Sequence, residues 1–78
     1  MSPKQTFVGI DVSKRQLDIA CRPAGQLSTA TNDEAGIKSL LKQLRCLRPS
    51  LVVVEATGGY ELSLVLALPP AKLPFARR

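Results

Sequence analysis

FVGIDVSKRQLDIA, residues 7–20, is the stretch that decides the predicted fold. Its first four residues are an apolar, β-prone run that stops abruptly at Asp11, which predicts a buried strand whose last residue emerges at an edge. The chain then turns at Ser13 and Lys14, and residues 15–22 alternate between apolar and polar side chains. This alternation predicts a half-exposed second strand, whose buried side chains are Leu17, Ile19 and Cys21.

Outside this stretch, the sequence predicts a third strand and then a helix. Residues 23–25 have turn chemistry, so residues 26–31 can return as the last strand of an antiparallel meander. Helical spacing of apolar residues follows and predicts an amphipathic helix. Thr31 and Glu34 have the spacing of a capping box at its start, and Pro49 ends it. The repeating apolar positions are Ile37, Leu40, Leu41, Leu44 and Leu47.

The second half of the chain predicts one more strand and one more helix. Residues 51–54 are a continuous apolar, β-branched run, which predicts a strand covered on both faces and ended by Glu55. Residues 60–68 favour a helix until two prolines break it, and residues 71–78 show no persuasive pattern. The predicted order is strand, strand, strand, helix, strand, helix, so we expect an α/β fold with a mixed sheet.

Asp11 and Glu55 each end a strand that we expect to be buried. A strand reached through a helix usually lies parallel to an earlier strand, and the first strand is its most buried neighbour. Adjacent strands lie about 4.8 Å apart, so the two carboxylates would converge where the strand order switches direction. Close carboxylates repel each other unless a cation lies between them, and Mg²⁺ prefers oxygen ligands. A blander interpretation stays open, in which Asp11 caps a turn and Glu55 is a solvated strand end.

Length and composition bound the remaining possibilities. The 78 residues make one domain at most, residues 1–78. A net charge of +5 and a pI near 9.8 suit a polyanionic partner such as nucleic acid, but do not specify one. The start has no apolar leader and residues 62–68 are too few to span a bilayer, so we expect a cytoplasmic protein with no membrane partner. Cys21 and Cys46 lack paired spacing, and we expect both to be reduced and semi-buried.

Two motifs carry a family resemblance, FVGIDVSKRQLDIA at residues 7–20 and VVVEATGGY at residues 52–60. In order and spacing they resemble the N-terminal domain of the DEDD insertion-sequence transposases, RuvC-like recombinases related to a site-specific DNA invertase. The resemblance covers residues 6–66, leaves residues 67–78 as a divergent tail, and implies a ribonuclease-H-like fold. It also implies that Asp11 and Glu55 are catalytic residues that bind Mg²⁺ or Mn²⁺.

Other parts of the family pattern have no counterpart in this sequence. The family's closely spaced aspartate pair is missing because no acid follows Glu61, and its separate serine-bearing domain is missing too. We therefore expect an incomplete domain, a fragment of a DNA transposase whose parent cleaves and joins DNA strands, and expect the fragment alone to be inactive. The resemblance implies DNA as a partner and a structured guide RNA as a further partner, and the truncation suggests pairing with a full-length transposase.

Residues beside the two acids are candidates for contact with nucleic acid. Lys14 and Arg15 would meet the DNA backbone, Gly58 and Gly59 would let the backbone approach a phosphate, and Tyr60 would stack on a base. Thr57, in the same loop, is a further candidate. Each also has an ordinary alternative, namely a solvated turn charge, a loop that needs positive φ, and a tyrosine that packs at a helix start.

Two functions of other classes stay open. One is a non-catalytic module that binds DNA, a transposase or itself, through an uncovered sheet edge beyond residues 52–55. The other is a fragment of an actin-like ATPase or sugar kinase, whose sheet begins with a similar Gly-Ile-Asp run. Val12-Ser13-Lys14 replaces the Gly-Thr expected after that acid, and Glu55 at the end of a crossover strand fits the nuclease better.

Overall fold

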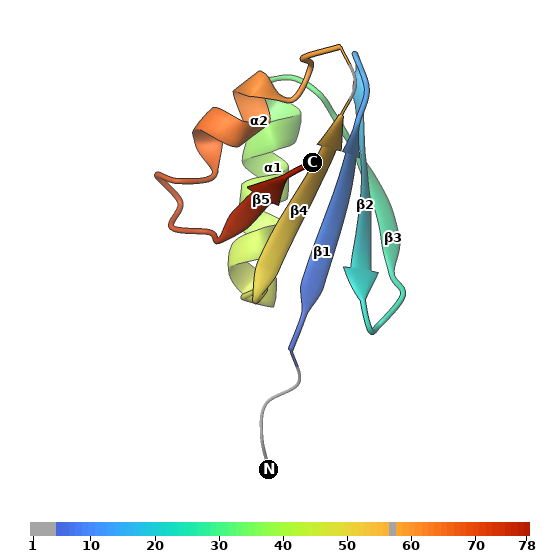
Figure 1. Cartoon of the computed structure of the whole chain (residues 1–78), viewed down its shortest axis with the longest axis vertical. Helices are drawn as coiled ribbons and strands as arrows, with labels where there is room; N and C mark the ends of the chain where they lie inside the picture. Colours follow the sequence, from blue (N-terminus) through green and yellow to red (C-terminus); the bar gives the residue numbers. More distant parts are fainter. Residues whose placement is uncertain (1–4, 57) are drawn as a thin grey trace.

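A five-stranded mixed sheet organises the part of the chain that the computed structural model describes, residues 5–56 and 58–78. Its strands are β1 (Phe7–Val12), β2 (Gln16–Arg22), β3 (Leu27–Thr31), β4 (Leu51–Ala56) and β5 (Phe75–Arg77), in the order β3-β2-β1-β4-β5 (Figure 1). β1, β2 and β3 pair antiparallel, whereas β4 lies parallel to both β1 and β5. The meander and the parallel placement of β4 beside β1 are as predicted.

β5 is the element that the sequence did not reveal, since it lies within residues 71–78, where no pattern was evident. Its pairing is fixed by the backbone: the Val52 amide donates to the Pro74 carbonyl and the Arg78 amide donates to the Val54 carbonyl, each at 2.9 Å. β4 is therefore an inner strand. The expected uncovered edge beyond β4 was wrong, because β5 occupies it.

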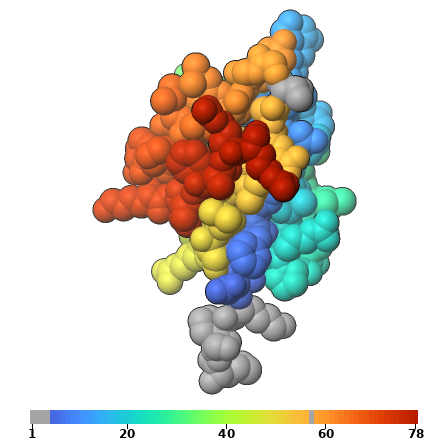
Figure 2. All heavy atoms as spheres, viewed as in Figure 1, coloured from blue at the N-terminus to red at the C-terminus, as the bar shows by residue number. Residues whose placement is uncertain are grey.

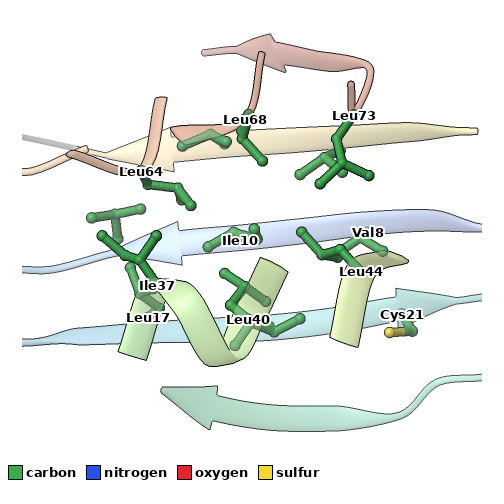
Figure 3. Packing of buried hydrophobic residues seen from close by; sticks show 14 residues of the cluster. Val8, Ile10, Leu17, Cys21, Ile37, Leu40, Leu44, Leu64, Leu68 and Leu73 are labelled. Atoms are coloured by element: carbon green, nitrogen blue, oxygen red, sulfur yellow. The ribbon is translucent and has the colours of Figure 1, made fainter. Parts of the chain in front are cut away.

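Two helices, α1 (Glu34–Leu47) and α2 (Leu62–Ala67), cover one face of the sheet and form the core with it (Figures 1 and 3). Alternate strand residues point toward these helices, as the period of two requires. Leu40 and Leu44 of α1 and Leu64 of α2 are almost completely buried. The core strand residues are Val8, Ile10, Val12, Leu17, Ile19, Cys21, Val52 and Val54.

The opposite face of the sheet, which we call the open face, carries no helix in the described part of the chain (Figure 1). This corrects the expectation that residues 51–54 are covered on both faces: Val52 and Val54 are buried, but Leu51 and Val53 are only half-buried. Phe7 on the same face is 41% exposed. A continuous apolar run predicted two-sided burial, whereas both helices lie on one side.

The ends of the helices also differ from the prediction. The N-cap of α1 is Asp33, whose carboxylate accepts from the Gly36 amide at 2.7 Å, and Thr31 donates to Asp33 at 2.8 Å. Thr31 cannot cap the helix itself because its backbone pairs with Gln16 in the sheet. α2 is shorter than the predicted residues 60–68.

Within the described residues, no helix has the length and apolar character needed to cross a membrane.

The two cysteines have different environments. Cys21 is buried in the core, whereas Cys46 is exposed on α1, and both are free thiols. The expectation of two semi-buried cysteines was therefore wrong for each of them in opposite directions. Cys46 falls outside the apolar stripe of α1, so the helix turns it toward solvent.

Candidate metal and nucleic-acid site

Asp11 and Glu55 are direct register partners on the parallel strands β1 and β4. Each is the second-last residue of its strand, and both lie on the open face, because their neighbours Ile10, Val12 and Val54 are anchored in the core. The prediction that these two acids meet across neighbouring parallel strands is confirmed. The carboxyl ends of parallel strands are a usual location for a site in α/β sheets.

The two acids share a small recess on the open face. Asp11, Glu55, Ala56 and Arg78 line this recess, which has a volume of about 300 Å³ and which we call the acid recess. The Arg78 guanidinium Nη1 donates to Glu55 Oε1 at 2.9 Å. Figure 2 shows the C-terminal residues, in red, lying against β4, in yellow. Arg78 was missed from the sequence because its position depends on β5.

A third acid lies beside the pair. Asp18 of β2 is the antiparallel register partner of Asp11, so Asp18, Asp11 and Glu55 form a row across three adjacent strands. Asp18 accepts a hydrogen bond from Gln16 Nε2 at 2.8 Å. Alternation in the sequence correctly placed Asp18 away from the core, but only the pairing register could reveal its neighbour.

The acid recess fits a hard divalent cation through its oxygen donors. Asp11 and Glu55 offer carboxylate oxygens, which Mg²⁺ and Mn²⁺ prefer, and the Arg78 guanidinium on Glu55 is a cation already attracted to the same place. Across residues 5–56 and 58–78, no three histidine, cysteine or acidic side chains cluster closely enough to make a complete metal site. The two carboxylates would supply only part of a coordination shell, and water or other ligands would supply the rest.

A longer groove leads to the acid recess along the open face. It has a volume of about 860 Å³ and runs over β3, β2, β1 and β4. Its acidic end holds the row of three acids, its other end holds Arg22, and its middle is apolar. The apolar and small residues that line it are Phe7, Gly9, Ala20, Leu27 and Val53.

Asn32 links the loops at the acidic end of the sheet. Its side-chain Nδ2 donates to the Ser13 carbonyl at 2.9 Å and to the Tyr60 carbonyl at 3.0 Å, with a longer contact to the Lys14 carbonyl at 3.5 Å. These bonds join the β1–β2 turn to the loop before α2. This role was not evident from the sequence, because an asparagine between a strand and a helix usually serves only a local cap or turn.

The predicted nucleic-acid residues gather at this same end. Lys14 and Arg15 are exposed in the β1–β2 turn, and Gly58 has a positive φ of 81° in the loop after β4. Tyr60 is partly exposed beside Gly58, where a Cβ on the glycine would meet its ring. Thr57 lies outside the described residues. The structure thus brings the described candidates together in the loops that follow β1 and β4, namely Lys14, Arg15, Gly58, Gly59 and Tyr60.

Comparison with known proteins identifies the fold. No protein-family model matches the chain, and no curated protein does. The structure of T. thermophilus RuvC in complex with a Holliday junction substrate matches with a TM-score of 0.73 at 15% identity, over 96% of this chain and 64% of that one. A second Thermus thermophilus RuvC structure matches with a TM-score of 0.62 at 19% identity, over 94% of this chain and 60% of that one.

The chain therefore spans less than two thirds of the RuvC chains that it matches. The matches include nearly all of this chain, and RuvC has a ribonuclease-H-like fold. Identities of 15% and 19% establish shared architecture and leave the function to be argued from the site. The chain has a ribonuclease-H-like α/β fold.

Proposed function

We propose that this chain is part of a metal-dependent enzyme that cleaves and joins DNA strands, of the DEDD transposase type. The observation that carries the proposal is the direct pairing of Asp11 with Glu55 at the carboxyl ends of β1 and β4 on the open face. The RuvC structure solved with a Holliday junction supports DNA as the substrate class for this architecture. The two transposase-like motifs favour recombination over other nuclease functions.

In this proposal Asp11 and Glu55 hold Mg²⁺ or Mn²⁺, which supplies Lewis-acid chemistry for phosphodiester cleavage when bound. The two carboxylates fix the position of the ion on a rigid sheet, since the flanking residues of both strands are buried. Lys14 and Arg15, in the adjacent turn, neutralise DNA phosphates and set the register of the duplex. Gly58 and Tyr60 approach the strand from the neighbouring loop.

The number of acids limits what the chain does alone. A two-metal phosphodiester site normally needs more carboxylates than Asp11 and Glu55, and the described residues contain no cluster of three metal-ligating side chains. We therefore expect weak metal binding and negligible DNA nicking by this chain. Robust Mg²⁺-dependent cleavage of supercoiled DNA that disappears in Asp11→Asn would contradict this expectation and establish a complete site.

DNA binding by the acidic end of the sheet is tested with two matched double variants. Lys14→Gln with Arg15→Gln removes two charges beside the site, and Lys38→Gln with Lys42→Gln removes two exposed charges from α1 on the opposite side. Fluorescence anisotropy with a short duplex should show a larger loss of affinity, and a smaller salt dependence, for the first variant. Equal losses of affinity in both variants would mean that DNA binding depends on the net charge of the protein and not on which face carries the charge.

A structured guide RNA is a further partner within the same proposal, as the transposase resemblance implies. Competition of a folded RNA against the duplex in the anisotropy assay tests it directly. If RNA displaces the duplex from the wild-type protein but not from the variant with Lys14→Gln and Arg15→Gln, RNA and DNA bind at the same end of the sheet. RNA that binds both proteins equally would place its contacts elsewhere.

The open face favours one alternative function, self-association as a non-catalytic module. Its groove has an apolar middle, an acidic end at Asp11 and a basic end at Arg22, so a second copy turned end for end would match apolar to apolar and base to acid. Sedimentation velocity tests this, with Val53→Asp as the variant that places a charge in the apolar middle. A concentration-dependent dimer that Val53→Asp dissociates supports the alternative, and a monomer at all concentrations rejects it.

A further inference from the structure

Arg78 has two attachments that place its charge at the acid recess. Its backbone amide donates to the Val54 carbonyl at 2.9 Å, which continues the β4–β5 pairing by one residue. Its guanidinium then reaches Glu55 Oε1, also at 2.9 Å. Because the first bond involves only the main chain, the position of residue 78 does not depend on which side chain it carries.

Arg78 also has the charge that the row of acids lacks. Asp18, Asp11 and Glu55 lie side by side on adjacent strands, and like charges directly opposite each other in a sheet are destabilising. Among the described residues, Arg78 is the one basic side chain in an ion pair with this row, since the other ion pair joins Arg77 to Glu61. The guanidinium thus partly neutralises the recess.

We propose that the Arg78 guanidinium is a built-in competitor of the divalent cation, so that metal binds to Glu55 only when the Arg78 side chain leaves it. This inference rests on the proposed metal site and adds its regulation. A guanidinium and a divalent ion in one recess of about 300 Å³ repel each other and draw on the same carboxylate oxygens. Any ligand that attracts Arg78 away, such as a DNA phosphate, would then favour metal binding.

The size of the effect follows from the exposure of the pair. The Arg78 and Glu55 side chains are 73% and 56% exposed, so water and salt screen their attraction. An exposed ion pair of this kind corresponds to a change in affinity of at most about fivefold. We therefore expect Arg78 to weaken metal binding by about two- to fivefold and not to prevent it.

The test compares Arg78→Gln with Arg77→Gln in Mn²⁺ titrations followed by electron paramagnetic resonance. Both variants lose one positive charge at adjacent positions, but Arg77 pairs with Glu61 at 4.0 Å and does not line the acid recess. Arg78→Gln should bind Mn²⁺ about two- to fivefold more tightly than Arg77→Gln at low salt, and the difference should shrink at high salt. Arg78→Lys, which keeps a cation, should stay close to wild type.

The outcomes separate this inference from the proposed function. Equal Mn²⁺ affinities for Arg78→Gln and Arg77→Gln, with binding still lost in Glu55→Gln, would overturn the competition and leave the metal site standing. Mn²⁺ binding that is unchanged in Glu55→Gln, or absent from every variant, would overturn both. Circular dichroism of each variant confirms the fold, and paramagnetic broadening of the Asp11 and Glu55 NMR signals shows where the ion lies.

Discussion

Removing the charge of Asp11 should stabilise the metal-free protein, although it moves a chain of net charge +5 further from neutrality. Asp11 has an acidic register partner on each side, Asp18 in β2 and Glu55 in β4. Two charges about 5 Å apart repel by about 0.8 kcal/mol in bulk water and about 3 kcal/mol at an effective dielectric constant of about 20. Arg78 offsets the charge of Glu55, and measured cross-strand pairs lie near the low end of that range.

The expected gain for Asp11→Asn is therefore about 1 kcal/mol in the free energy of unfolding. In a domain of this size, that gain raises Tm by about 4–8 °C. The assay is thermal unfolding followed by circular dichroism in EDTA at low salt, repeated at high salt, where screening should reduce the gain. A matched control is Glu34→Gln, which removes the same charge from the first turn of α1 and should lower Tm, since a negative charge there is favourable.

A decrease in Tm for Asp11→Asn at low salt, similar to that of Glu34→Gln, would refute this reasoning. It would mean that Asp11 makes favourable interactions in the folded state that outweigh its two acidic neighbours. An increase in Tm that persists unchanged at high salt would also count against it, because a gain from relieved repulsion between exposed charges must fall with screening.

Three other predictions concern the loops and the start of α1. Gly36→Ala should lower the free energy of unfolding by about 1–3 kcal/mol, although helices usually prefer alanine, because a Cβ there overlaps the Thr31 carbonyl oxygen. Chemical denaturation tests this, and Ser39→Ala, at an exposed position of the same helix, is a control that should be neutral or stabilising. Asn32→Asp should lower the free energy of unfolding by about 1–3 kcal/mol, because it removes the donor that joins two loops and turns a carboxylate toward carbonyl oxygens. An unchanged free energy of unfolding would show that these hydrogen bonds make no net contribution to stability. The Gly36 amide and the Thr31 hydroxyl lower the pKa of Asp33 from its ordinary value of 3.8, so its stabilising effect is present above pH 3.8 and is lost as pH falls through the lowered pKa. Asp33→Asn keeps an N-cap and should make the acid limb of an unfolding-versus-pH curve shallower; an unchanged limb would contradict this assignment.

Local patterns were enough to predict most of the sheet and the pairing at its centre. Alternation over residues 15–22 and the helical period that follows each need only neighbours in the sequence, and the crossover rule then places β4 parallel to β1. The proximity of Asp11 and Glu55 followed from these two steps. Asp18 joined the row only when the pairing register was known, because alternation gives the face of Asp18 but not which residue of β1 lies opposite it.

The features that the sequence did not reveal all depend on contacts between distant segments. β5 has three residues, too few to display a period, and exists because its backbone satisfies the hydrogen-bonding groups of β4. The pairing of Arg78 with Glu55 follows from that strand. One-sided burial of residues 51–54 could not be inferred, since an apolar run does not tell which faces the helices will cover. Asn32 acts through two carbonyls far from it in the chain.

The most direct test of the central claim, that Asp11 and Glu55 hold one divalent ion together, is a double-mutant cycle on Mn²⁺ affinity. Asp11→Asn and Glu55→Gln should each weaken binding strongly, and the double variant should lose little more than either single variant, because both carboxylates serve the same ion. Asp18→Asn, the neighbouring acid in the row, should weaken binding far less. Losses that add in full, or Mn²⁺ binding that survives in the double variant, would show that the two acids do not share an ion.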